Sequence, residues 1–162
     1  ISKCVFYISV LTVFLIIKKG SRMKGLKWWM VSVGIFYILN LVLLWPSLWA
    51  PQLPGMYPGV NLFQEEIVFQ LLLDAWLIVG LGLASIGVVL IVGAKRPMRY
   101  YPALIPVVLI TETVFSVWDI YSAMHHEDVV IAIITLVIHV IIIVTGIKVW
   151  KNALMLEVEA VS

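Results

Sequence analysis

Four polar residues interrupt long apolar runs of the chain and are the first candidates for chemistry. Asn40, Asp74, Glu112 and His139 each lie in a different run. At a helical rise of about 1.5 Å per residue, each lies about 8 to 15 Å inside its run from one polar end. Ionisable groups are costly inside a bilayer and usually mark a functional site. Their similar depth predicts a shared polar cavity. The alternative is hydrogen bonding between helices together with an oligomer contact.

Three more polar residues would extend this cavity toward one membrane surface. Thr111 adjoins Glu112, Asp119 follows Glu112 after two helical turns, and Thr135 precedes His139 by one turn on the same face. Two carboxylates in a medium of low dielectric resist both being ionised. Such a pair suits a general acid or base, a proton relay, or a counter-ion for an amine. The residue types fit all three chemistries.

A second cluster of titratable residues lies in predicted loops. His125 and His126 adjoin two acidic residues, and Glu65 and Glu66 precede another apolar run on the same predicted side. Imidazoles and carboxylates bind divalent metals, which makes these four residues the metal candidates. No ligand spacing of a metal site is present, and the better interpretation is a solvated acidic loop. We therefore expect no metal and no other cofactor.

Five apolar runs must position these residues, and they cover 1–17, 28–45, 63–92, 100–118 and 129–150. Only a helix or a closed barrel satisfies its backbone in lipid, and the runs lack the alternation of barrel strands. The sequence therefore predicts an all-α fold, a polytopic bundle of five transmembrane helices forming one domain over 1–162. The first run could instead be a signal peptide, although the basic residues after it favour a helix. Gly80, Ala84 and Gly87 share one helical stripe, which predicts close packing of another helix.

Basic residues predict the orientation of the bundle. Lys and Arg gather in the breaks 18–27 and 93–99 and near the end of the last run, whereas 46–62 and 119–128 contain none. By the positive-inside rule, the N-terminus is outside and the C-terminus inside. The external loop 46–62 is interrupted by prolines and cannot be a regular helix. It either folds back on the bundle as a lid or simply connects two helices.

Composition agrees with a membrane protein and limits the partners. Hydrophobic residues make up 63% of the chain and charged residues 12%, outside the range of soluble domains. The expected location is a plasma or inner membrane, or the endoplasmic reticulum. The expected partners are membrane lipid, a hydrophobic small molecule, and other membrane subunits or a second copy of the chain. Nucleic acid is not expected, because the basic residues lie where anionic lipid would meet them.

Three short strings carry a resemblance to a known family: 66–71 (EIVFQL), 95–100 (KRPMRY) and 102–105 (PALI). They resemble the EXPERA superfamily, which includes emopamil-binding protein and the sigma-two receptor. The resemblance implies four helices around a lipophilic pocket that binds sterols or cationic amphiphiles, with Glu66 or Asp74 as the acidic residue of the third run. The second run lacks the His-x-x-x-Glu pair that isomerase members need, so the resemblance does not extend to isomerase activity.

Three functions are compatible with these features. The first is an outward-facing polar pocket that binds a lipophilic or cationic small molecule. The alternative is a non-catalytic accessory subunit of a larger membrane complex, with Asp74 and Glu112 contacting partner helices. The third is a proton-coupled carrier, which is the weakest because transporters usually contain internal repeats and this chain shows none.

Overall fold

The computed structural model describes residues 22–57, 66–125 and 127–161. These residues are all-helical, as predicted, and the first predicted run lies outside them. The helices are α2 (Arg22–Leu43), α3 (Pro46–Trp49), α4 (Leu53–Met56), α5 (Glu66–Gly93), α6 (Pro97–His125) and α7 (Val129–Val161).

Within the described residues, four helices are long and apolar enough to cross a membrane. The spanning segments are Lys24–Leu43, Glu66–Gly93, Pro97–His125 and Val129–Val158. About 20 helical residues cross the hydrocarbon core, so each segment is long enough. In each segment, at most 39% of the apolar 18-residue stretch that identifies it is buried inside the bundle, which leaves wide apolar surfaces for lipid. These features indicate a membrane protein.

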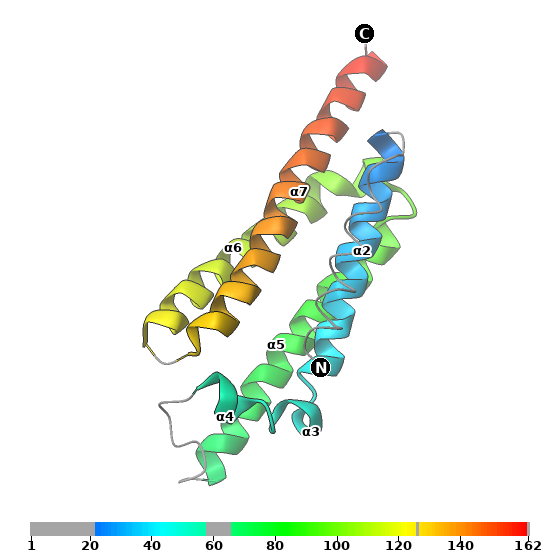
Figure 1. The fold of residues 1–162 in the computed structure, drawn as a ribbon. Coiled ribbons are helices and arrows are strands. Elements are labelled where there is room, and N and C mark those ends of the chain that lie inside the picture. The colour runs from blue at the N-terminus through cyan, green and yellow to red at the C-terminus, as the bar shows by residue number, and fades with distance from the viewer. Residues whose placement is uncertain (1–21, 58–65, 126, 162) are drawn as a thin grey trace.

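The helices associate mainly as two pairs (Figure 1). α2 runs beside α5, α6 runs beside α7, and α2 also contacts α7 between the pairs. Glycines set the closeness of α2 and α5. A Cβ atom added at Gly87 would lie 2.5 Å from the Gly34 carbonyl oxygen, and one added at Gly80 would lie 3.3 Å from the Leu41 Cα. Two backbones can approach this closely only where at least one of the facing residues is a glycine.

Two apolar clusters fill the bundle at different levels. The larger lies in the middle and toward the start of α2, and its fully buried members include Trp29, Met30, Val33, Ile105, Val108 and Ile142. The Trp29 indole nitrogen donates to the Thr145 hydroxyl at 3.0 Å, so its polar edge is satisfied. The smaller cluster gathers α4 and its cap against α5, and comprises Leu53, Met56, Tyr57 and Leu73.

The described part of the predicted loop 46–62 folds onto the bundle. α3 and α4 are single turns that carry proline in their first positions, where proline's missing N–H costs no hydrogen bond. Leu53 is fully buried, and the Met56 carbonyl accepts the Asp128 backbone N–H at 2.7 Å. This bond joins α4 to the α6–α7 turn, and we call this end of the bundle the α4 end.

Several helices are longer than predicted. α2 begins at Arg22, α6 reaches His125, and α7 continues to Val161. The predicted loop 119–128 is therefore wrong over most of its length. Hydropathy marks where lipid ends, but a helix ends where capping or packing stops it. Asp119 and Ser122 are buried on α6, so the polar residues that were expected to end α6 instead face its neighbours.

Asp128 caps the start of α7. Its Oδ1 atom accepts the backbone N–H groups of Val130 at 3.0 Å and Ile131 at 3.1 Å. We expect Asp128→Ala to lower the free energy of unfolding by about 1 kcal/mol, because two N–H groups lose their acceptor. Denaturant unfolding in detergent measures this. Asp128→Asn keeps an oxygen acceptor and should stay closer to the wild type; equal losses in both variants would contradict the cap.

Candidate functional site

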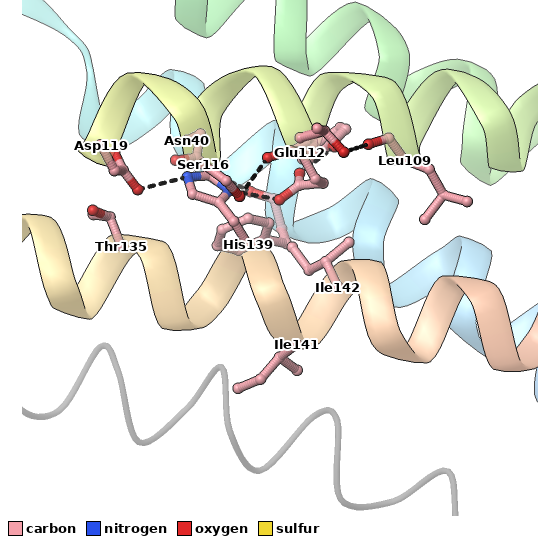
Figure 2. A network of polar contacts seen from close by, with 12 residues as sticks. Asn40, Leu109, Glu112, Ser116, Asp119, Thr135, His139, Ile141 and Ile142 are labelled. Carbon is pink, nitrogen blue, oxygen red and sulfur yellow. Dashed lines mark hydrogen bonds and ion pairs between the residues drawn. The ribbon is translucent and has the colours of Figure 1, made fainter. Parts of the chain in front are cut away.

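A buried carboxylate, Glu112, joins three helices. Glu112 lies on α6 and is only 1% exposed. The Tyr37 hydroxyl of α2 donates to Glu112 Oε1, and His139 Nδ1 of α7 lies 2.6 Å from Glu112 Oε2 (Figure 2). Both carboxylate oxygens are therefore occupied by protein groups. Glu112 holds α2, α6 and α7 in register in the middle of the bundle.

His139 connects Glu112 to a second carboxylate. His139 Nε2 lies 3.5 Å from Asp119 Oδ2, two turns along α6 from Glu112 (Figure 2). Phe115 stacks on the imidazole with ring centroids 5.6 Å apart and planes 14° apart. A protonated imidazole held in this way donates to Glu112 and lies within ion-pair distance of Asp119. It can balance the charge of only one of them.

A cavity of about 170 Å³ adjoins this network. Five aromatic residues contribute to its wall, namely Phe36, Trp49, Trp76, Phe115 and Trp118. Its polar lining residues are Asn40, Asp119, Glu127, Thr135 and His139. Among the residues that the structure describes, no Lys or Arg lines it. The cavity is therefore aromatic and acidic, with one imidazole as its basic group.

The α6–α7 turn supplies the second acidic residue of the lining. Glu127 is buried, and its Oε2 atom accepts the Ser122 hydroxyl at 2.5 Å. Tyr57, which caps α4, lies near it. Burial raises the pKa of the Tyr57 hydroxyl to about 12, and the charge of Glu127 acts in the same direction. Tyr57 therefore stays protonated at neutral pH beside this carboxylate.

The structure brings most of the predicted intramembrane residues together. Asn40, Asp119, Thr135 and His139 line the cavity, and Glu112 lies behind them in contact with His139. Thr135 faces Asp119 (Figure 2), and its hydroxyl also donates to carbonyls of its own helix. Thr111 is half-buried and does not line the cavity.

Asp74 does not join this group. It is exposed on α5 and does not line the cavity. The rotation of α5 explains the difference, because Gly80 and Gly87 must face α2 for the backbones to meet. This rotation turns Asp74 toward the outside of the bundle. The prediction that Asp74 shares the cavity is therefore wrong.

The metal candidates do not form a site in the described part of the chain. His125 is exposed, and its ring nitrogen Nδ1 is bonded to the Tyr121 carbonyl at 2.7 Å. Glu66 is exposed at the start of α5, whereas Glu65 and His126 lie outside the described residues. No three His, Cys, Asp or Glu residues among those described gather closely enough for a metal ion.

Sequence reasoning missed the aromatic lining of the site and, in particular, Tyr37 and Trp49. Tyr37 supplies the hydroxyl that satisfies Glu112, and Trp49 brings the α3 segment into the cavity wall. Tyr37 could have been predicted from its spacing, because it precedes Asn40 by three residues and so lies on the same side of α2. Trp49 could not have been predicted, since the path of a proline-rich loop is set by contacts that are distant in sequence.

Comparison with known proteins identifies relatives. The BphX-like family matches residues 23–155, which include every residue of the network and cavity. Uncharacterized BphX-like proteins of Burkholderia cepacia and Paraburkholderia xenovorans are each 43% identical to the chain over 130 residues, which is 80% of this chain and 93% of the relative. No solved structure matches. The expected membership of the EXPERA superfamily is therefore wrong. Its three strings are short apolar and basic segments of a kind that membrane composition produces without common descent.

Proposed function

Since the chain belongs to the BphX-like family, we propose its function from its own site: it is an integral membrane protein that binds a small lipophilic or cationic molecule in the cavity at the α4 end. The observation that carries this proposal is an aromatic cavity joined to a buried network of Glu112, His139 and Asp119. Mostly apolar cavities with a few placed polar groups are the usual form of small-molecule sites.

The network supports binding because it is already organised. Glu112 bonds the ring nitrogen Nδ1 of His139, and Phe115 stacks on a face of the ring. His139 and Asp119 therefore meet a ligand in fixed positions, which reduces the entropy lost on binding. By the positive-inside rule this end of the bundle faces outward, so the ligand would enter from outside the cell or from the outer leaflet.

The packing below the network favours binding over proton conduction. Beyond Tyr37 and Glu112, toward the start of α2, the described core is mostly apolar, with fully buried side chains such as Val33, Val108 and Ile142. Its polar members are few, chiefly buried Ser32 and the Trp29–Thr145 hydrogen bond. A proton relay needs hydrogen-bonding groups or water along its whole length. The described polar network ends at mid-depth, as expected of a binding site with one entrance.

A second candidate function rests on Asp74. Its carboxylate is exposed on a helix whose neighbouring exposed residues are apolar, such as Leu71 and Ile78. A carboxylate on a lipid-facing surface is usually paired with another group. A partner chain that covers this face of α5 would make the protein an accessory subunit, or one half of a homo-oligomer.

Native mass spectrometry of the protein purified in mild detergent separates the two functions. A small molecule retained on a lone protomer or homodimer supports the cavity as a binding site, and its mass gives the ligand class. Polypeptides that co-purify without such a molecule support the accessory subunit.

A substitution that fills the cavity tests the binding function directly. Val79 lines the cavity, so Val79→Trp should displace the retained molecule and weaken binding of a lipophilic fluorescent probe about tenfold or more, which corresponds to about 1.4 kcal/mol. Ile78→Trp is the matched control, because Ile78 is 68% exposed on the same helix. If both variants retain the molecule as the wild type does, the cavity is not the site.

A further inference from the structure

Two buried polar atoms of the cavity residues have no hydrogen-bond partner within the described chain. They are Asp119 Oδ2, a hydrogen-bond acceptor, and Trp49 Nε1, a donor. Asp119 is only 7% exposed, and both residues line the cavity. Buried polar atoms are almost always paired with protein or with another molecule. One of these atoms is an acceptor and the other is a donor, and both belong to residues of one cavity. They therefore indicate a ligand that carries both a hydrogen-bond donor and a hydrogen-bond acceptor.

Charge balance indicates that the donor is cationic. Glu112 is engaged by Tyr37 on one oxygen and by His139 on the other. A protonated His139 balances one negative charge and stands between two carboxylates, Glu112 and Asp119. No Lys or Arg among the described residues lines the cavity. Within this trio one carboxylate charge is therefore left over, and buried Glu127 adds another acidic group to the lining. Asp119 Oδ2 lies 3.5 Å from His139 Nε2 but accepts no hydrogen bond within the described chain. A buried carboxylate is strongly destabilising without a positive partner.

The aromatic walls suit the same charge. Trp49 and Trp76 meet edge to face with ring centroids 5.7 Å apart, and Phe115 and Trp118 line the cavity from α6. Aromatic faces attract ammonium groups and also pack against apolar carbon. The walls can therefore hold both the charged head and the apolar body of one molecule.

We propose that the cavity binds a protonated primary or secondary amine whose apolar body carries a hydrogen-bond acceptor. The ammonium group donates to Asp119 Oδ2, and the acceptor receives the Trp49 indole N–H. The inference rests on the proposed function, and it names the ligand class of that same cavity. A quaternary ammonium ion is a poorer fit, because it has no N–H to donate to the carboxylate.

Three small probes test the proposal on the full chain in detergent at neutral pH, with binding measured by calorimetry. They are phenethylamine, its analogue with a hydroxyl on the carbon next to the ring, and the neutral phenethyl alcohol. Phenethylamine should bind about tenfold to a hundredfold more tightly than phenethyl alcohol, as expected for a hydrogen bond to a charged group. The hydroxylated amine should gain a further factor of about threefold to tenfold from Trp49.

Two variants assign each contact. Asp119→Asn should weaken both amines about tenfold to a hundredfold and weaken phenethyl alcohol much less, because only the amines carry a charge. Trp49→Phe should remove the advantage of the hydroxylated amine over phenethylamine, so that the two amines bind this variant equally tightly. Each variant is compared with the wild type by thermal unfolding, and Trp49→Phe keeps the test decisive if Asp119→Asn fails to fold.

The outcomes separate this inference from the proposed function. If phenethyl alcohol binds the wild type as tightly as phenethylamine, or if no probe binds, the amine assignment is overturned. Displacement of the retained molecule by Val79→Trp would still support the cavity as a binding site in that case. If Val79→Trp also changes nothing, both the proposed function and this inference fail.

Discussion

Glu112→Ala should lower the free energy of unfolding by about 3 to 5 kcal/mol, the usual effect of removing one partner of a buried charged pair. The substitution removes the acceptor of the Tyr37 hydroxyl and of His139 at the same time. Glu112 is 1% exposed, so water cannot replace the lost bonds without opening the bundle. The contacts of α2, α6 and α7 at this level would all weaken together.

Unfolding in detergent, followed by helical circular dichroism, measures this effect. Thr113→Ala is the matched control, because Thr113 is the next residue on α6, is exposed, and donates only to the Leu109 carbonyl of its own helix. We expect the control to change stability by less than about 0.5 kcal/mol. Glu112→Gln keeps the shape and one acceptor oxygen and should lie between the two.

A double-mutant cycle isolates the Tyr37–Glu112 bond. Because the two side chains share one bond, Tyr37→Phe should cost much less in the Glu112→Gln background than in the wild type. Strictly additive losses would contradict the coupling. A Glu112→Ala protein as stable as Thr113→Ala would show that the network does not hold the helices together.

The convergence of Glu112, Asp119 and His139 was predictable because each residue had few alternatives. A titratable side chain in an apolar run must turn inward and meet another polar group, and three such residues on two neighbouring helices could satisfy one another. The spacing of Glu112 and Asp119 on one face of α6 already implied a common partner. The structure adds the identity of that partner, the imidazole of His139.

Asp74 shows where the same reasoning fails. The position of Asp74 along the helix could be predicted from the sequence. The direction of its side chain around the helix axis could not, because the rotation of α5 follows from the glycine contacts with α2. The small-residue stripe was recognised in the sequence, yet the partner helix was unknown.

The segments that cross the membrane were predictable from hydropathy, because lipid selects long apolar stretches. The ends of the helices were not predictable, because capping and packing decide where helices such as α6 and α7 stop.

Gly87→Leu should separate α2 from α5 and lower the free energy of unfolding by about 3 kcal/mol, near the upper end for overpacking. A Cβ atom at this position would lie 2.5 Å from the Gly34 carbonyl oxygen. A backbone atom cannot rotate away as a side chain does, so the two helices must move apart. Gly82→Leu is the matched control on the same helix, because a Cβ atom there has no neighbour within 4 Å.

The substitution should also reach the binding site. The same Cβ atom would lie 3.1 Å from the Tyr37 Cβ, so displacement of α2 carries the Tyr37 hydroxyl away from Glu112. We therefore expect Gly87→Leu to weaken binding of amine probes as well as stability, whereas Gly82→Leu should leave both within a few tenths of a kcal/mol of the wild type, about the size of an ordinary surface substitution. Thermal unfolding and calorimetry on the same two preparations measure both effects. A Gly87→Leu protein that loses stability but binds the probes normally would show that the α2–α5 contact supports the fold without positioning Tyr37 for the site.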